Sequence, residues 1–361
     1  MAIRGGNRMR LKLMILLIVS LLFISACGKT ESTKTAGTKA NGSASDYKIG
    51  ISIPMEANNS IKTWYKAIQA RADVYGFKVM GIDAQGDASK QSSDINTLIG
   101  QDIDALIVWP LDSKAIQPAL VRAADKGIPA FGIDFNVQKG GDDFGLVNQI
   151  IAGRESAAIT VAKLFADSYS EADVAGIGFA IPVPGNLFVM DKYKSELKNY
   201  PNLNFVGQKD NPSDNIAGAE PLMKNLLTAN PTIKAVFAYN DESAIGASQA
   251  VSNAGGELYS KDNKEGMMIV GFNAEAGGIQ AIKNGKMYAT FNINPVKSGA
   301  IQVDFIHDYL VEDSKDSIAK EIIVPSPIID QSNVNEFISW EEELKLVKDL
   351  KFDALKESGA K

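Results

Sequence analysis

The chain has 361 residues, a formal net charge of −6, one cysteine and one histidine. An acidic chain is poorly suited to nucleic acid, whose binding needs clustered cations that displace counterions. A single cysteine cannot form an intrachain disulfide, so the fold must be held by its apolar core. This length is ample for two domains. One histidine also excludes a histidine-rich metal site.

The first 27 residues have the pattern of an export signal. Basic side chains come first, and an almost wholly apolar run follows over 13–24, ending in small residues before Cys27; the basic residues are Arg4, Arg8, Arg10 and Lys12. The run is shorter than the ~20 residues that span a bilayer. Its end resembles a bacterial lipobox, in which the cysteine is acylated, for example by palmitate, and the peptide is cut before it. We expect a lipoprotein signal peptide over 1–26; the alternative is an uncleaved N-terminal anchor.

The segment after Cys27 predicts a flexible tether over 27–46. Residues 28–45 contain no aromatic or branched aliphatic side chain, so they cannot bury enough apolar surface to offset chain entropy. Removing residues 1–26 leaves 33 basic against 43 acidic side chains, a net charge near −10. The folded part is therefore expected on the outer face of a bacterial plasma membrane, held there by the lipid on Cys27.

From residue 47 onward, short apolar runs alternate with helical patterns, which is typical of parallel α/β sheets. The first array predicts strands at 48–53, 78–83, 104–109 and 129–133, with helices at 60–75, 89–100 and 113–126. The second array predicts strands at 173–179, 203–207, 234–238, 267–272 and 287–293. Its helices are predicted at 149–168, 186–198, 214–229, 242–254, 274–284 and 296–312. The fold class is therefore α/β, with two doubly wound parallel-sheet lobes.

Ligands of such sheets bind at the carboxyl ends of the strands, so the residues there are the informative ones. Carboxamides dominate, with a few carboxylates and aromatic rings: the strand ends are 54–59, 109–110, 134–136, 148, 182–186, 240–241, 273 and 292–294. Sugar hydroxyls both donate and accept hydrogen bonds, and amide and carboxylate side chains can match them. The composition of these ends is compatible with a ligand that both donates and accepts hydrogen bonds.

Motifs of common enzyme classes are missing from the sequence. It has no H-E-x-x-H, no G-x-S-x-G and no phosphate-binding P-loop, and its glycine-rich run at 176–185 lacks dinucleotide-binding spacing. His307 lies in a helical stretch and is interpreted as an ordinary helix residue. We expect a binding protein without enzymatic activity, cofactor or metal.

Several segments together resemble one family. The run at 222–247, with its Asn-Asp-x-x-A-x-G turn, resembles the second lobe of ribose-type periplasmic sugar-binding proteins. The runs at 269–295, 126–134 and 103–120 resemble neighbouring segments of the same family, and the resemblance covers roughly 47–340. It implies a type I periplasmic binding protein fold, in which the chain crosses between two hinged lobes three times, near 148, 294 and 322. The implied lobes are 47–148 plus 294–322 and 149–293 plus 323–361, with a terminal helix over 336–357.

The resemblance also implies the site residues. Asp134 is expected as the main acceptor, Asn240 and Asn273 as contacts from the second lobe, Asn148 beside the first crossing, and Asn58 or Asn59 over the first lobe; the stacking faces are expected to be Phe135 and Trp64. Each has a structural alternative, since strand-end asparagine is often only a turn or cap residue and Trp64 can be core. Trp109 is interpreted as packing beneath the cleft, and Asn186 and Asn294 are not favoured.

This chain departs from the ribose-type pattern at four places. Phe135 stands where an arginine is usual, no arginine occurs at 187–189, Asn273 replaces a carboxylate, and Ile293 replaces a glutamine. These changes make the predicted site less charged, so ribose itself is in doubt while the sugar-or-polyol class remains.

The expected function is that of a monomeric receptor that delivers a sugar or polyol to the permease of an ABC importer. The alternative is a sensor subunit that presents the ligand to a membrane kinase or chemoreceptor. A repressor of similar fold would need a helix-turn-helix where this chain has its export signal. A glycosidase would need a carboxylate pair across the cleft.

Overall fold

The computed structural model describes residues 42–137 and 140–348, which contain two six-stranded sheets. The first sheet has the order β11-β5-β4-β3-β1-β2, and all its strands are parallel. Its strands are β1 (Lys48–Ile53), β2 (Lys78–Asp83), β3 (Ala105–Val108), β4 (Ala130–Ile133), β5 (Asn148–Ala152) and β11 (Glu321–Val324). We call this sheet and its helices the first lobe.

The second sheet has the order β12-β10-β9-β8-β6-β7. It is parallel except for β12, which pairs antiparallel with β10. Its strands are β6 (Ala172–Phe179), β7 (Leu203–Asn211), β8 (Ile233–Ala238), β9 (Met268–Val270), β10 (Ala289–Phe291) and β12 (Ile328–Asp330). This sheet and its helices form the second lobe.

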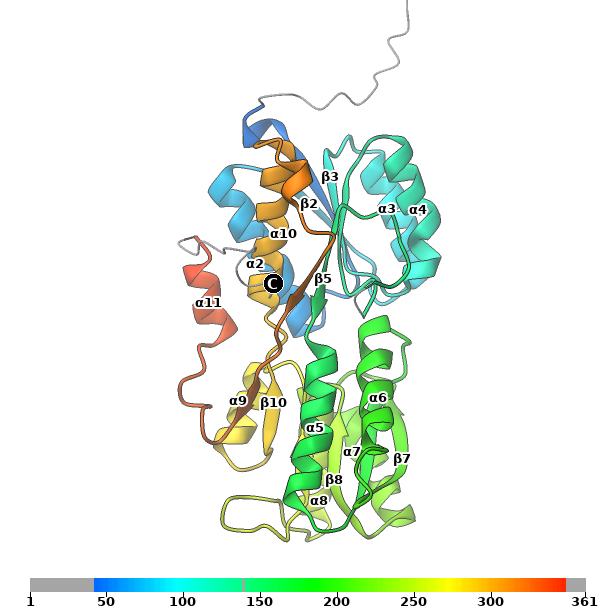
Figure 1. Ribbon diagram of the computed structural model, residues 1–361, viewed down its shortest axis with the longest axis vertical. Coiled ribbons are helices and arrows are strands. Elements are labelled where there is room, and N and C mark those ends of the chain that lie inside the picture. The colour runs from blue at the N-terminus through cyan, green and yellow to red at the C-terminus, as the bar shows by residue number, and fades with distance from the viewer. Residues whose placement is uncertain (1–41, 138–139, 349–361) are drawn as a thin grey trace, which may run out of the picture. The chain divides into compact units, whose positions relative to one another are not determined.

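Helices cover both faces of the first sheet because successive strand residues point to opposite sides. Leu106 and Val108 of β3 pack with α3 (Ala88–Ile99) and α4 (Ser113–Asp125), whereas Ala105 and Ile107 face the core of α2 (Asn59–Tyr75) and α10 (Pro295–Leu310). Figure 1 shows α2 and α10 side by side. The short helix α11 (Trp340–Leu346) contacts these two helices, and single 3-10 turns lie at η1 (Ala44–Asp46) and η2 (Lys315–Ser317).

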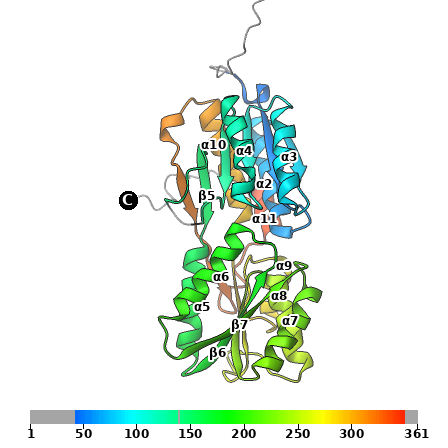
Figure 2. The same ribbon diagram turned by 90° about the vertical axis from the view of Figure 1, so that its right-hand side faces the viewer.

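The second sheet is covered in the same way. Val174 and Phe237 face the side of α5 (Arg154–Ser168) and α6 (Pro184–Leu197), which lie next to each other in Figure 2. Ala175 and Val236 face α7 (Ile216–Ala229), α8 (Asp241–Asn253) and α9 (Ala276–Lys283). Both predicted βα arrays are therefore confirmed as doubly wound sheets.

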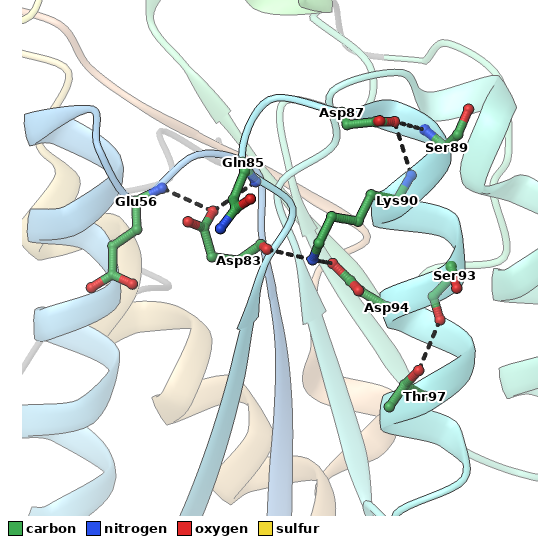
Figure 3. A network of polar contacts seen from close by, with 9 residues as sticks. All are labelled: Glu56, Asp83, Gln85, Asp87, Ser89, Lys90, Ser93, Asp94 and Thr97. Carbon is green, nitrogen blue, oxygen red and sulfur yellow. Dashed lines mark hydrogen bonds and ion pairs between the residues drawn. The ribbon is translucent and has the colours of Figure 1, made fainter.

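A polar network holds the loop that follows β1 against the end of β2 (Figure 3). The Asp83 carboxylate accepts hydrogen bonds from the backbone N–H groups of Glu56 (3.1 Å) and Gln85 (3.0 Å). Lys90 of α3 donates to the Asp83 carbonyl (2.7 Å) and pairs with Asp94 (2.7 Å). The loop over 54–58 is thus tied to the end of β2 through Glu56.

The chain passes between the sheets three times, as the resemblance implied, but at shifted positions. It crosses at Gly153, at 292–294 and at 325–327. The crossings contact one another, because Asn294 Nδ2 donates to the Pro325 carbonyl (2.6 Å) and Asn292 N–H to the Pro327 carbonyl (3.0 Å). A Cβ on Gly153 would lie 2.6 Å from the Ser326 nitrogen, so only glycine fits there.

Three sequence expectations about the fold need correction. Residues 149–152, expected as the start of a helix in the second lobe, form β5 of the first sheet. The resemblance places 323–361 in the second lobe, but residues 323–324 belong to β11 of the first sheet and α11 packs on the first lobe. Residues 44–46 of the expected tether form a 3-10 turn with Ala44 buried. In each case contacts with distant strands or helices override local composition.

Other expectations fall on residues that the structure does not describe. The signal peptide over 1–26, Cys27 with the tether to residue 41, and residues 349–361 of the terminal helix lie outside the described ranges. Across 42–137 and 140–348, no helix has the length and apolar character needed to cross a membrane.

Candidate functional site

A cavity lies where the carboxyl ends of strands from both sheets meet. In each sheet the strand order reverses at one point, between β1 and β3 in the first and between β6 and β8 in the second. Residues at or just after the ends of these four strands line a cavity of about 50 Å³: Pro54, Met55, Asn58, Trp109, Pro110, Leu111, Phe179, Ile181, Tyr239 and Asn240. Ligands of open α/β sheets bind at such reversal points. Both lobes therefore present their expected binding edge to one space.

Asn58 lines this cavity from the first lobe, and its side-chain oxygen already accepts hydrogen bonds from the protein. Its Oδ1 accepts hydrogen bonds from the backbone N–H groups of Ser60 (3.1 Å) and Ile61 (3.2 Å), so it caps the start of α2. Its Nδ2 donates to Asp214 Oδ2 of the second lobe at 3.0 Å. Only the donor end of this carboxamide faces the cavity.

Asn240 is built in the same way on the second lobe. Its Oδ1 caps α8 by accepting from the Ser243 N–H (2.9 Å), and its Nδ2 donates to Asp214 Oδ1 (2.8 Å). We had expected these amides to offer both a donor and an acceptor. Capping engages the oxygen of each amide, so the nitrogen is the end that is turned toward Asp214 and the cavity.

Asp214 accepts the hydrogen bonds of both carboxamides, through Oδ2 from Asn58 and through Oδ1 from Asn240. It lies between β7 and α7 in the left-handed region (φ 49°) and lines the cavity. Tyr239 OH also donates to its carboxylate. Burial raises the pKa of Asp214, and the hydrogen bonds from Tyr239 and Asn58 oppose that rise.

Sequence reasoning missed Asp214. It ended the preceding strand at 207 and began a helix at 214, whereas β7 continues to Asn211 and α7 begins at Ile216. The available signal was the Ser-Asp-Asn run before an apolar helix, since Asn215 caps α7.

Aromatic rings line the cavity, but they are not the two that we predicted. Phe179 and Tyr239 stack with ring centroids 5.0 Å apart and an interplanar angle of 12°. Trp109, which we interpreted as packing beneath the cleft, packs edge-on against Trp64 at 5.5 Å and also lines the cavity. These rings can cover the C–H faces of a sugar.

The expectation that Trp64 forms a stacking face is wrong, because its ring is fully buried in the core. Its Nε1 donates to Gln302 Oε1 of α10 (2.7 Å), which satisfies the indole inside the α2–α10 contact. Phe135 is also misassigned. It packs on the other face of the first sheet, in the cluster beneath α3 and α4, with Phe144 at 5.5 Å.

Asn148 does not reach the cavity either. It is the first residue of β5, aligned with Phe131, so it lies away from the carboxyl end of that strand. Its Nδ2 donates to the Ala319 carbonyl (2.6 Å). The missed strand β5 accounts for this error, because the expected position assumed that the first crossing began at Asn148.

Asp134 lies at the end of β4 as predicted, yet both its oxygens are engaged by protein groups. Oδ1 accepts from the Ala152 N–H (2.9 Å), and Oδ2 pairs with Arg154 Nε (3.0 Å). Arg154, not Asp134, is the residue of this pair that lines the cavity. The geometry gives Asp134 the task of orienting Arg154, which sequence reasoning did not single out.

A second cavity of about 250 Å³ adjoins the first and is acidic. Asn58, Asn59, Asp214, Glu242 and Glu275 are among the residues that line it. Burial is the main cause that raises the pKa of Glu275 to about 7, and the neighbouring Glu242 adds to the rise. Hydrogen bonds from the side chains of Asn273 and Asn59 act in the opposite direction.

Four of the predicted residues, Asn58, Asn59, Asn240 and Asn273, are therefore brought to the two cavities. Asn273 has a positive φ of 110° and lines the first cavity, with its Nδ2 3.3 Å from Glu275 Oε1. Their contact with a ligand stays a prediction. No cluster of His, Cys, Asp and Glu suited to a metal ion occurs in the described part of the chain.

Known proteins resemble this chain over most of its length. Residues 49–314 match the periplasmic binding protein domain family. The ribose import binding protein of Bacillus subtilis is 30% identical over 298 residues, which cover 82% of this chain and 92% of that protein. The xylitol-binding protein of Mycolicibacterium smegmatis is 23% identical over 324 residues, covering 87% of this chain and 83% of that protein.

Solved structures share the fold. The periplasmic binding component of the arabinose ABC transporter from Shewanella sp. ANA-3, bound to arabinofuranose, has a TM-score of 0.73 at 22% identity and covers 84% of this chain and 99% of its own. The Caulobacter myo-inositol binding protein has a TM-score of 0.72 at 22% identity, covering 85% and 99%. With its two doubly wound sheets, three crossings and shared cavity, this chain belongs to the ribose-type family of periplasmic sugar-binding proteins and has their type I fold.

Proposed function

We propose that this protein is an extracytoplasmic, lipid-anchored receptor that captures a neutral sugar or polyol between its lobes and delivers it to an ABC permease. The observation that carries the proposal is the cavity at the reversal points of both sheets, where amide donors from each lobe surround Asp214 beside a stacked aromatic pair. Hydroxyl groups can accept from the amides and donate to the carboxylate, and the rings suit apolar C–H faces.

The relatives support the class of ligand. Proteins with this fold and with recognisable sequence similarity are named for binding ribose, xylitol and D-apiose. Their ligands share several hydroxyl groups and no net charge. Such molecules suit a cavity in which the charge of Arg154 is balanced by Asp134.

Binding can be tested by titration calorimetry of residues 42–361 with D-ribose, xylitol, L-arabinose and myo-inositol. We expect one or more to bind, and Asp214→Ala to weaken that binding at least about 30-fold, which corresponds to ~2 kcal/mol for removal of a half-buried charged acceptor. Asp210→Ala is the matched control, since Asp210 is an exposed carboxylate of the same strand region. Equal loss of affinity in both variants would contradict the site.

The lipid anchor rests on the lipobox-like run that ends at Cys27. In a bacterial host, the full-length protein is expected in the membrane fraction and Cys27→Ala in the soluble or unprocessed fraction. Labelling with an alkyne-bearing palmitate analogue reports the acylation directly. Labelling of the Cys27→Ala variant would refute this assignment.

A further inference from the structure

A buried arginine at the cavity has hydrogen-bonding capacity that the protein does not use. Arg154 is the first residue of α5, directly after the first crossing, and is 4% exposed. It lines the first cavity, yet its Nη1 is buried and has no hydrogen-bond partner among the described residues. Native proteins pair nearly all buried polar groups, so an unpaired one calls for an explanation such as a functional role, stored strain, a bound water or an ion. Six buried side-chain atoms of the described residues are unpaired, and Arg154 Nη1 is the one among them that belongs to a charged side chain.

The guanidinium is held on three sides. The Asp134 carboxylate binds Nε at 3.0 Å, and the Phe272 ring lies beneath, with its centroid 5.3 Å from Cζ. Gly185 of α6 covers it closely, since a Cβ at that position would come within 2.6 Å of Nε. These contacts fix the orientation of the side chain during folding, so little ordering is left for the moment of binding.

A purely structural ion pair does not explain this arrangement. Arginine and a carboxylate commonly pair through two parallel N–H bonds. Here Asp134 accepts a single hydrogen bond from the guanidinium, from Nε to Oδ2, because its Oδ1 accepts from the Ala152 N–H (2.9 Å). The pair orients the guanidinium and leaves Nη1 for another acceptor.

Building on the proposed function, we propose that Arg154 is a ligand-binding residue that donates from Nη1 to an oxygen of the bound sugar or polyol. The family resemblance led us to expect one arginine at position 135 and another within 187–189. Position 135 is a phenylalanine, and residues 187–189 contain no arginine. Arg154 supplies a guanidinium from a different element, the first turn of α5, and so approaches the ligand from the hinge.

The charges around the cavity select the class of ligand. The carboxylate of Asp134 balances the positive charge of Arg154. Asp214 adds a carboxylate to the first cavity, and Glu242 and Glu275 add two more to the adjoining second cavity. A phosphorylated or carboxylated sugar would meet an excess of negative charge. Because the arginine side chain can only donate hydrogen bonds, the ligand atom that contacts Nη1 must be a hydrogen-bond acceptor, such as a ring, hydroxyl or carbonyl oxygen. The ligand is therefore a neutral polyhydroxy compound with an accepting oxygen at the Arg154 end.

The test compares the double variant Asp134→Asn/Arg154→Met with the wild type. The double variant removes the guanidinium without leaving a buried unpaired carboxylate, and the oxygen of the introduced amide would still accept from the Ala152 N–H. Arg122→Met is the control, because Arg122 is an exposed arginine on α4 that hydrogen-bonds Asn96 (2.7 Å). Titration calorimetry uses D-ribose, xylitol, L-arabinose and myo-inositol together with D-ribose 5-phosphate and D-gluconate, and thermal unfolding reports folding. A second variant, Arg154→Lys, keeps the positive charge but replaces the planar guanidinium and its several N–H donors with a single ammonium group.

We expect a neutral compound to bind the wild type and the Arg122→Met control alike, and to bind the folded double variant 10- to 100-fold more weakly, with Arg154→Lys also weakened. Unchanged affinity in the double variant would overturn the role of Arg154 and leave the proposed function standing. Preferential binding of the phosphate or of gluconate would overturn the neutral ligand class. If the wild type bound none of the six compounds, the proposed function would fail and the inference with it.

Discussion

Replacing Glu275 by glutamine should make the protein more stable at neutral pH but not in acid. Glu275 is 5% exposed, and its carboxylate lies near those of Glu242 and Asp214, with Asp241 also close. Burial and the neighbouring Glu242 raise its pKa to about 7. The ionised form is therefore disfavoured in the folded state. Glutamine keeps the oxygen that accepts from Asn273 Nδ2 and carries no charge.

The size and the direction of this effect follow from the pKa. Raising it from 4.5 to about 7 corresponds to about 3 kcal/mol. Below pH 4.5 the side chain is protonated both folded and unfolded, so ionisation costs nothing. Between pH 4.5 and 7 the unfolded chain gives up this proton while the folded protein keeps it, so the wild type loses stability as the pH rises, and above pH 7 both states are ionised and the loss is complete. The advantage of Glu275→Gln should thus grow between pH 4.5 and 7 and level off above.

Urea denaturation at pH 4.5, 6 and 8 measures this advantage. We expect the difference in unfolding free energy between variant and wild type to increase by up to about 3 kcal/mol from the lowest to the highest pH. Glu265→Gln is the control, because the Glu265 side chain is 94% exposed and its variant should show no such pH dependence. A difference for Glu275→Gln that is constant across these pH values would refute the reasoning.

Two further predictions concern the framework of the site. Arg71→Met should destabilise the protein by on the order of 3–5 kcal/mol in urea denaturation, because Asp304, 2.6 Å from Arg71 Nε, would stay buried without its cation; a loss below about 1 kcal/mol would contradict this. Gly153→Val should cost about 1–3 kcal/mol, because its side chain would meet the Ser326 nitrogen where two crossings touch. Wild-type stability in that variant would mean that the crossings can separate freely.

Much of the fold could be predicted from the sequence because strands and helices alternate with clear periodicity. The missed strand β5 shows where that signal is weak. Residues 148–152 are all buried, and only Gly153 separates them from α5, so their apolar side chains read as the start of the helix. Its pairing with β4 and β11 depends on residues far away in the chain.

The site was predictable in its location but not in its chemistry. The strand-end rule selected Asn58, Asn240 and Asn273 as ligand contacts; the structure brings all three to the first cavity, and their contact with a ligand stays a prediction. Spacing alone could not tell which atoms of these amides are free, since that depends on capping contacts. Nor could it tell that Trp64 is buried, because its partner Gln302 lies 238 positions later. Arg154 was missed for a similar reason, as its place at the cavity follows from the strand that was missed.

Because Asn58 and Asn240 each begin a helix with one end of the amide and face the cavity with the other, stability and selectivity are coupled at these positions. Alanine would remove both functions at once, and helix starts accept only a few residue types. Aspartate is one of them and would keep the cap, but it would replace an amide that donates to Asp214, at 3.0 Å from Asn58 and 2.8 Å from Asn240, with a second carboxylate. A change from asparagine to aspartate can thus alter the hydroxyl pattern that the cavity recognises only when Asp214 is replaced by a neutral residue at the same time. The same constraint tells a protein engineer which substitutions to try first when retargeting this cavity.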